Sequence, residues 1–328
     1  MRRKISVAPM MDCTDRHDRF FLRLISKNVM LYSEMVATKS AIHGDRKKIL
    51  SYSPEEKPLA LQVGGSDKKE LAEVAKIAED MDYDEININL GCPSKKVQKN
   101  KFGACLMKEP DLVSECIDKM INSCNIPVTV KTRIGFDDTE SFDYLNKFIL
   151  KLKEAGCKTF ILHARKAILK GLTPKQNLNI PKLNYEMVYN IKKENPNLEI
   201  IINGGISTID EIKKHLKLCN GVMIGRAIYQ NPYFLTDIED KIFNVKDKPT
   251  REQIAEKLLK YLEKEVKLGT KVNHIMRHTV GLYHGQAGSK KWKRYLSDNM
   301  MARDSDFQKA KHIMEIVQNN EKINQAIL

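Results

Sequence analysis

The sequence lacks the marks of a membrane-spanning or secreted chain. No uninterrupted apolar run is longer than four residues, as at 29–32, whereas a transmembrane helix needs about 20. The N-terminus is basic, but Pro9 and Asp12 come before an apolar signal region can develop. The seven cysteines are scattered and include no C-x-x-C pair, so they indicate neither a disulfide framework nor a zinc ribbon. We therefore expect a cytoplasmic protein.

Two nucleotide-binding fingerprints and a metal signature are also missing. Neither G-x-G-x-x-G nor G-x-x-x-x-G-K-[ST] occurs, which disfavours a doubly wound sheet. His274 and His278 have the i, i+4 spacing of a metal-binding pair on a helix. Because the H-E-x-x-H signature and an evident third ligand are absent, we expect no metal site.

The formal net charge of +14 is unevenly distributed along the chain. Residues 241–328 carry 18 Lys and Arg against 10 Asp and Glu, a net charge of +8, while the first 240 residues carry +6. A basic region of this kind is typical of a protein that binds a polyanion such as nucleic acid. Lysine-rich usage that only reflects genome composition is the alternative.

Short aliphatic or β-branched runs alternate with helical periodicities over about the first 230 residues. This alternation predicts an α/β fold, and eight such units fit a (β/α)8 TIM barrel. The predicted strands span residues 5–8, 31–33, 59–63, 85–89, 128–132, 159–163, 199–203 and 221–224. After Pro249 the periodicity is only helical. We therefore expect a TIM-barrel catalytic domain over residues 1–240 and a smaller all-helical domain over residues 241–328.

Polar residues follow the predicted strands at the ends where a barrel carries its active site. Gln62, Asn89, Lys131 and His163 would offer neutral donors and acceptors and one cation to a planar heterocycle. Glycine-rich turns after the seventh and eighth strands are typical of the phosphate site of such barrels. Together these features suit FMN, with Lys131 placed for the negative charge that a reduced flavin develops.

A sugar-phosphate isomerase is the competing use of the same barrel. It would usually need a carboxylate base at the end of a strand. Glu34 and Glu85 are the only candidates, and Glu85 lies at a strand start. The residues therefore favour a flavin.

Eight motifs together resemble the tRNA-dihydrouridine synthases over residues 5 to about 300. They are APM at 8–10, QVGG at 62–65, NINLGCPS at 87–94, GACLM at 103–107, VKTRIG at 130–135, HAR at 163–165, NGG at 203–205 and GR at 225–226. The motifs at 15–17, 284–286 and 294–297 resemble the bacterial A-type subfamily, which acts on uridines 20 and 20a of the tRNA D-loop.

The resemblance implies an FMN-containing barrel with a helical tRNA-binding domain. In this family NADPH reduces FMN, hydride passes to C6 of a uridine, and a cysteine protonates C5. Carried over by motif, Cys92 would be the proton donor and Asn89 a uracil contact. The residues implied to contact FMN are Pro9, Met10, Met11, Gln62, Lys131, His163, Asn203, Gly204, Gly205, Gly225 and Arg226.

Cys92 also has a chemical argument of its own. It stands between Gly91 and Pro93 in a loop at the predicted mouth. A thiol with an ordinary pKa of about 8.5 is protonated at neutral pH and can act as an acid. A buried structural thiol is the alternative interpretation.

Basic residues are the candidates for RNA contact. Lys175 lies in the loop after the sixth strand, and Lys291 and Arg294 have i, i+3 spacing in the basic C-terminal region. We also assign Arg133, at the end of the fifth strand, to the substrate. The lone Trp292 lies among these charges, and we interpret it as a core anchor rather than a stacking platform.

Two other functions fit parts of the sequence. A tRNA-binding folding factor without chemistry would use the basic helical region but would not need Cys92, Asn89 and Lys131. A small-molecule flavin oxidoreductase would use the barrel but would not account for the basic helical tail. We therefore expect an enzyme that uses FMN and NADPH and binds the D-loop of tRNA.

Overall fold

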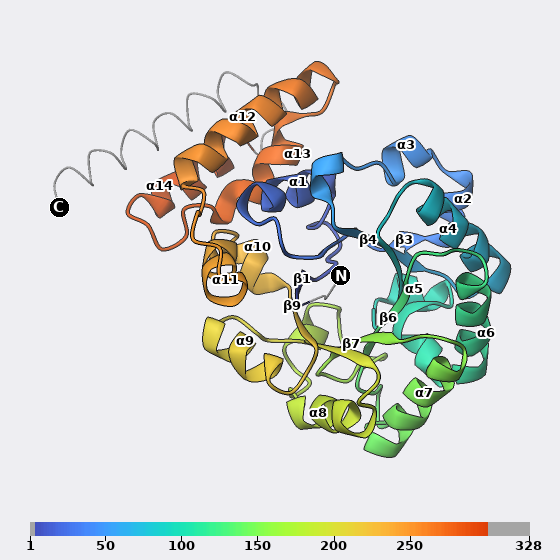
Figure 1. The fold of residues 1–328 in the computed structure, drawn as a ribbon. Coiled ribbons are helices and arrows are strands. Elements are labelled where there is room, and N and C mark those ends of the chain that lie inside the picture. The colour runs from blue at the N-terminus through green and yellow to red at the C-terminus, as the bar shows by residue number, and fades with distance from the viewer. Residues whose placement is uncertain (1–3, 301–328) are drawn as a thin grey trace. The chain divides into compact units, whose positions relative to one another are not determined.

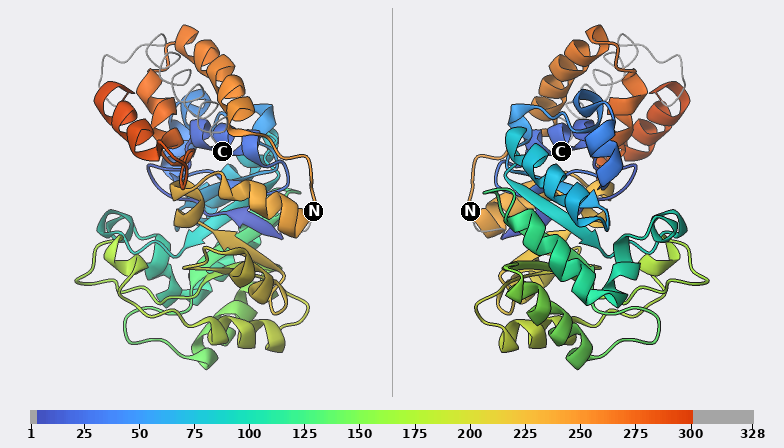
Figure 2. Two further views of the ribbon diagram at one scale, coloured as in Figure 1. Left: turned by 90° about the vertical axis from the view of Figure 1, so that its left-hand side faces the viewer. Right: turned by 90° about the vertical axis from the view of Figure 1, so that its right-hand side faces the viewer.

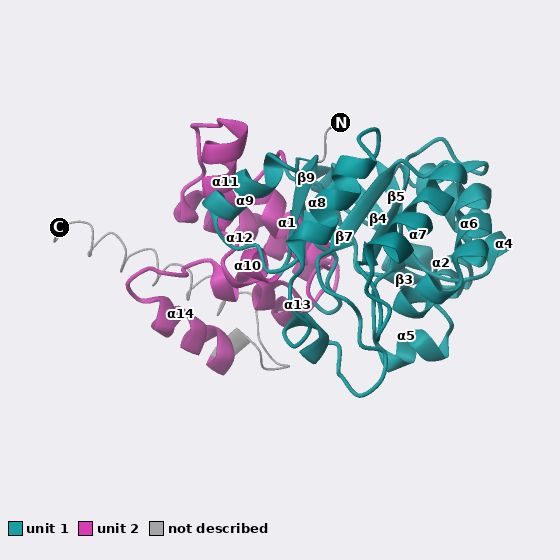
Figure 3. Ribbon diagram, turned by 90° about the horizontal axis from the view of Figure 1, so that it is seen from below, with its two compact units in different colours: residues 1–12, 29–225 teal, residues 13–28, 226–328 magenta. Residues whose placement is uncertain are grey.

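The computed structural model describes residues 4–300. The chain forms two compact units, the first made of Met1–Asp12 and Val29–Gly225 and the second of Cys13–Asn28 and Arg226–Leu328 (Figure 3). Within the described part, no helix combines the length and apolar character that crossing a membrane requires. The two units are described separately below.

The first unit is built on a sheet in which every strand pairs in parallel with its neighbours (Figure 1). The strands are β1 (Ile5–Val7), β2 (Leu31–Tyr32), β3 (Val36–Ala37), β4 (Leu59–Gly64), β5 (Glu85–Leu90), β6 (Val128–Arg133), β7 (Thr159–His163), β8 (Glu199–Asn203) and β9 (Gly221–Ile224). Their order is β1-β9-β8-β7-β6-β5-β4-β2, with β3 also paired to β4. A parallel bridge between Ser6 and Met30 joins the two ends of this order and closes the barrel.

The predicted α/β fold is confirmed, and the eight predicted strands agree with the observed ones to within one residue at each end. The structure adds β3, which the sequence analysis missed. A two-residue strand carries too little alternation to be recognised as a pattern.

Helices follow the strands and pack around the outside of the barrel (Figure 1, Figure 2). They are α2 (Thr38–His43), α3 (Arg46–Ile49), α4 (Lys68–Asp80), α5 (Lys95–Lys99), α6 (Pro110–Ile121), α7 (Phe142–Glu154), α8 (Tyr185–Glu194) and α9 (Ile209–Leu216). The 3-10 turns are η1 (Pro54–Glu56), η2 (Gly103–Lys108) and η3 (Gln176–Leu178). Helix α4 shows the common pattern, since Asp67 caps its first turn and Leu71, Val74 and Ala78 are buried.

The lower part of the barrel interior is filled and leaves no room for a substrate. A buried cluster there consists of Ala8, Met30, Tyr32, Ala60, Ile161, Ile201 and Met223. Glu85 is fully buried and accepts hydrogen bonds from Tyr32 Oη, at 2.8 Å, and from Thr129 Oγ1. This sealed position removes Glu85 as the base of an isomerase.

The second unit is helical throughout its described residues. Its elements are α1 (Arg16–Ile25), α10 (Arg226–Gln230), α11 (Phe234–Phe243), α12 (Arg251–Lys267), α13 (Val272–Met276), η4 (Arg277–Gly281), α14 (Ser289–Tyr295) and the π-helical turn η5 (Leu296–Met300). Trp292 is fully buried, donates a 2.9 Å hydrogen bond to the Thr279 carbonyl and meets Tyr283 edge-on. The interpretation of Trp292 as a core anchor is therefore confirmed.

The compact units do not divide the chain at residue 240. The break lies at residues 225–226, and residues 13–28, which include α1, belong with the helical unit. The functional division into a catalytic domain over 1–240 and a tRNA-binding domain over 241–328 stays a prediction. Residues 301–328 of that domain lie outside the described residues.

Candidate functional site at the barrel mouth

A chain of carboxamides crosses neighbouring strands at the mouth of the barrel. Asn89 Nδ2 donates to Gln62 Oε1 at 2.9 Å, and Gln62 Nε2 donates to Asn87 Oδ1 at 2.8 Å. Asn87 Nδ2 in turn donates to Thr129 Oγ1 at 2.8 Å. Every link runs in the same direction, so each amide has one defined orientation. The structure thus brings together the predicted Gln62 and Asn89, and adds Asn87 and Thr129 as their supports.

Lys131 and Asn203 form a second polar pair at the same mouth. Lys131 Nζ donates to Asn203 Oδ1 at 3.1 Å, and Asn203 Nδ2 donates to the Met223 carbonyl at 2.8 Å. Burial, reinforced by the positive charge of Arg133, lowers the pKa of Lys131 to about 7. An anionic group bound here would favour the charged form of Lys131. The site therefore offers a cation that responds to negative charge on a ligand.

The backbone around Cys92 is fixed by hydrogen bonds on both sides. Asn89 Oδ1 accepts from the Gly91 amide at 3.1 Å and from the Cys92 amide at 2.9 Å. The Cys92 carbonyl accepts from the Ala104 amide at 2.9 Å. Burial raises the pKa of the Cys92 thiol and outweighs the opposing effect of Arg133 and Lys131. The thiol is consequently protonated at neutral pH and able to donate a proton.

Arg133 is placed differently from the other predicted site residues. Its side chain is buried and its Nε donates to the Gly91 carbonyl at 2.9 Å, while Nη1 donates to the carbonyls of Lys166, at 3.0 Å, and Asn177, at 3.1 Å. These contacts tie the Cys92 loop to the loop after β7. A direct contact with substrate stays a prediction for Arg133.

Asn177 is a supporting residue that sequence reasoning missed. It is fully buried, its Nδ2 donates to the Ile168 carbonyl at 2.9 Å, and its Oδ1 accepts from the Ile168 amide at 2.7 Å. All partners of its side chain are backbone groups, which every residue possesses. No sequence pattern therefore marks Asn177.

The glycines of the turns after β8 and β9 let neighbouring side chains approach the backbone closely. Gly204 and Gly205 have φ angles of 122° and 71°. A Cβ on Gly204 would lie 2.8 Å from Cδ2 of His163, and one on Gly225 would lie 3.3 Å from Met10 Sδ. Only glycine is free of strain at such φ angles and leaves backbone N–H groups open to a close ligand. The turns, together with Lys131 and the carboxamides, fit a flavin.

The remaining predicted residues are less buried. Pro9 and Met10 are half-buried after β1, and the side chain of Met11 is 54% exposed. Arg226 is the exposed first residue of α10 and belongs to the helical unit. Lys175 is exposed directly before η3. Roles for all of these residues stay predictions.

The predicted RNA contacts of the C-terminal region lie on one short helix of the helical unit. Lys291 and Arg294 are both exposed on α14, and Arg294 Nε lies 3.6 Å from Asp298 Oδ2. An exposed pair of this kind is weak and leaves the guanidinium accessible. Their role in RNA binding stays a prediction.

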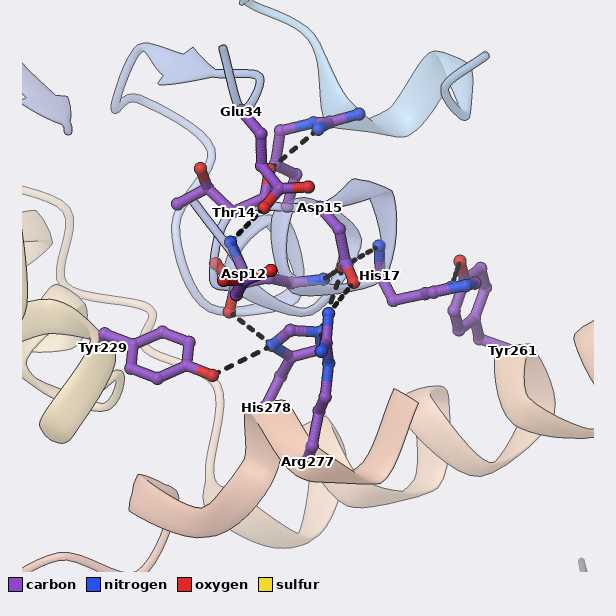
Figure 4. A network of polar contacts seen from close by, with 11 residues as sticks. Asp12, Thr14, Asp15, His17, Glu34, Tyr229, Tyr261, Arg277 and His278 are labelled. Carbon is purple, nitrogen blue, oxygen red and sulfur yellow. Dashed lines mark hydrogen bonds and ion pairs between the residues drawn. The ribbon is translucent and has the colours of Figure 1, made fainter. Parts of the chain in front are cut away.

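The helical unit contains a network of half-buried and buried charged groups that the sequence analysis did not foresee (Figure 4). Asp15 caps α1, pairs with Arg277 and lies 3.0 Å from His278 Nε2. Burial alone would raise the pKa of Asp15, but the hydrogen bond and charge of His278 hold it well below its usual range. Burial lowers the pKa of His17 to about 4, and His17 Nδ1 lies 2.7 Å from Tyr261 Oη.

Comparison with known proteins identifies related sequences. The family described as Dihydrouridine synthase (Dus) matches residues 6–321. A tRNA-dihydrouridine(20/20a) synthase of Shewanella oneidensis is 50% identical over 298 residues, which cover 90% of this chain and 89% of the relative. The protein of the same name from Escherichia coli K12 is 48% identical over 316 residues, covering 96% and 91%.

A solved structure supports the fold alone. The chain resembles a 2-naphthoyl-CoA reductase in complex with 2-naphthoyl-CoA, with a TM-score of 0.54 and 10% sequence identity. The match covers 72% of this chain and 49% of the other.

Proposed function

Because the chain belongs to the dihydrouridine synthase family, we propose that it reduces the C5=C6 bond of uridines in tRNA to give 5,6-dihydrouridine. The target is the D-loop, at uridines 20 and 20a. The observation that carries the proposal is the position of Cys92 at the barrel mouth, where its amide donates to Asn89 and burial raises the pKa of its thiol. The printed names of the relatives supply the substrate class and the positions.

The cofactor in this proposal is FMN, with NADPH as the electron donor. Gln62, Lys131, His163 and Asn203 would hold the ring system, together with Pro9, Met10 and Met11. The turns at 204–205 and 225–226 would hold the phosphate. When bound, FMN accepts hydride from NADPH and supplies it to C6 of the uracil.

The chain's own residues supply the proton and the orientation. Cys92 donates its thiol proton to C5 of the uracil as hydride arrives at C6, so NADPH and one proton from solvent are consumed for each dihydrouridine. Asn89 fixes the Cys92 backbone through Oδ1 and presents its amide to the uracil. The ammonium of Lys131 stabilises negative charge next to it. The reacting base must leave its stack, because both its face and its edge have to be reached.

Position along the tRNA is set by contacts to the RNA backbone. Lys175, Lys291, Arg294 and Arg133 are the proposed contacts, and such contacts orient a nucleic acid without reading bases. Both tRNA and NADPH as substrates agree with the cytoplasmic location expected from the sequence.

Two measurements test the proposal directly. Unmodified tRNA transcript, NADPH and the purified protein should yield dihydrouridine at positions 20 and 20a, detected by primer extension after alkaline ring opening. The chromophore released on denaturation should have the mass of FMN. Flavin-free folded protein that forms no dihydrouridine would instead support a tRNA-binding folding factor.

A further inference from the structure

A cavity of about 620 Å³ opens beside Cys92, within the range of roughly 300–1,000 Å³ typical of ligand pockets. Most of its lining comes from the segments at and after the ends of β3, β4 and β5, and Met11 after β1 and Met35 after β2 complete it. Lys131 and Arg133 stand on β6, which lies on the other side of β5, and they do not line the cavity. Cys92 therefore belongs to the cavity wall, whereas the side chains of Lys131 and Arg133 do not.

The apolar part of the cavity wall carries an aromatic ring. Phe102 lies against Gly64, because a Cβ on Gly64 would be 2.6 Å from a ring carbon and 3.0 Å from Met35 Sδ. The absence of a side chain at position 64 thus lets the ring and the thioether share this wall. A half-buried aromatic ring is the surface on which a planar base stacks, whatever its sequence identity.

Two carboxylates form a polar part of the wall. Asp67 Oδ1 accepts from the amides of Lys69, at 2.8 Å, and Glu70, at 3.0 Å, while Glu70 Oε2 accepts from Thr38 Oγ1 at 2.6 Å. The second oxygen of each carboxylate receives no hydrogen bond from the residues that the structure describes. These oxygens are acceptors for the N–H donors on the edge of a base.

The same carboxylates argue against a dinucleotide in this cavity. The pyrophosphate of a dinucleotide favours a helix N-terminus with open N–H groups. At α4 that position is capped by Asp67, and Glu70 adds a second carboxylate in the first turn. The lining also includes two exposed cations, Lys39 and Lys96, and the charge of Lys39 acts on Asp67. The cavity thus offers cations for one backbone phosphate and carboxylate oxygens for a base.

We propose that this cavity binds the nucleotide adjacent to the reacting uridine in the RNA chain. Its base stacks on Phe102 and offers exocyclic amino or imino N–H groups to Asp67 and Glu70, and its phosphate lies near Lys39 and Lys96. A flipped nucleotide leaves its neighbour without one stacking partner, and Phe102 replaces that partner. The inference rests on the proposed function and adds a second nucleotide to the recognised substrate.

A double-mutant cycle, in which one change is made in the protein and the other in the RNA, tests this site. Phe102→Leu keeps an apolar side chain against Gly64 but removes the aromatic face. The RNA partners are transcripts with an abasic nucleotide on the 5′ or on the 3′ side of the target uridine. The readouts are the tRNA dissociation constant, kcat/KM for dihydrouridine formation, and NADPH-driven flavin reduction without RNA. Lys213→Ala, an exposed lysine on α9, is the matched control.

We expect Phe102→Leu and the abasic change at one of the two flanks each to weaken binding and kcat/KM roughly tenfold, the size of a base–aromatic stack. Combined, they should cost little more than either alone, because both remove the same contact. Flavin reduction by NADPH should stay unchanged. The proposal would be overturned if the losses from Phe102→Leu and from the abasic nucleotide multiplied at both flanks. It would also be overturned if Phe102→Leu raised the KM for NADPH in the absence of RNA, because that result would indicate a dinucleotide site.

Glu70→Gln provides a second, independent variant if Phe102→Leu does not fold. It keeps an acceptor for Thr38 but presents an amide to the base, so discrimination between guanosine and inosine at the coupled flank should fall severalfold. Unchanged discrimination would contradict the carboxylate's role. Failure of the proposed function would look different, because the wild-type protein would then convert no uridine in any transcript.

Discussion

The carboxamide chain of the barrel mouth and the network around Asp15 in the helical unit both hold polar side chains, but the first is neutral and the second is ionised. The carboxamide chain links Gln62, Asn87 and Asn89 in one direction. The helical unit uses ionised groups centred on Asp15 and Arg277. A neutral network keeps its geometry over a wide pH range, whereas a charged one is stronger but depends on every partner remaining ionised. Chemistry and stability should therefore respond to different changes in the two regions.

Removing the thiol at the mouth should give the largest effect. Cys92→Ala keeps the backbone amide that Asn89 holds, so flavin content and NADPH oxidation should be retained. Dihydrouridine formation in a single turnover should fall by about 10² to 10⁴, the range for general acid catalysis. Cys124→Ala, a half-buried cysteine after α6, is the control and should keep full activity. Wild-type turnover by Cys92→Ala would exclude Cys92 from the reaction.

Removing the central carboxylate of the helical unit should cost stability instead. Asp15→Ala removes the carboxylate that pairs with Arg277 and His278, together with the cap of α1, and because the pair is half-buried it should lower the free energy of unfolding by about 2 kcal/mol, measured in urea. Asp45→Ala is the matched control, because Asp45 also caps a helix but lies at the surface without such partners in the described residues. If Asp15→Ala and Asp45→Ala lowered the free energy of unfolding by similar amounts, Asp15 would stabilise the protein only as a helix cap.

Mild acid should affect the two regions unequally. The pKa of His17 is about 4 in the folded protein against 6.5 for a free histidine, so between these values the unfolded chain binds a proton that the folded chain refuses. Stability should therefore fall by about 2 kcal/mol from pH 7 to pH 5. Asp15 does not contribute to the pH dependence in this window. Its pKa is depressed in the folded protein, so its stabilising effect is present above the unfolded value of 3.8 and is lost as the pH falls below that value.

The measurement is urea unfolding of wild type and His17→Gln at pH 7 and pH 5. The variant should lose most of the 2 kcal/mol difference, while His43→Gln, an exposed control on α2, should keep it. Equal pH dependence in wild type and His17→Gln would show that other groups titrate here. Burial also lowers the pKa of His215, which accounts for any smaller remaining slope.

Charge removal on the helical surface should give the smallest effect. Replacing Lys291 and Arg294 on α14 with Ala should reduce the salt dependence of tRNA binding by about one to two units in log K against log salt. Flavin content and NADPH oxidation should not change. An unaltered salt slope would assign α14 a structural role through Trp292 rather than an RNA-binding one.

The sequence was sufficient for the strands and for the residues at their ends. β-branched runs alternate clearly with helices, and in a parallel barrel every strand carries its C-terminal residue to the same mouth. Asn89 and Lys131 could therefore be assigned to one site from two distant motifs, and the structure places them on paired strands.

The contacts that could not be predicted are those whose partners leave no recognisable pattern in the sequence. The amphipathic periodicity of α1 shows that it buries one face but not which unit receives it. Arg133 binds three backbone carbonyls, and a carbonyl has no sequence signature. The pair between Asp15 and Arg277 joins positions 262 residues apart, and nothing in a single sequence couples them.

The hydrogen bond from the Ala104 amide to the Cys92 carbonyl has an evolutionary consequence. It fixes the two ends of the segment 93–103 next to each other. Gly103, with φ at 76°, allows the chain to pass close to the Cys92 carbonyl, because a Cβ at position 103 would lie 2.6 Å from the Cys92 oxygen. Lengthening or rewriting a surface loop between fixed ends costs little. Asn100, which is exposed, and Phe102, which is half-buried, can therefore diverge and change substrate preference while the acid stays in place.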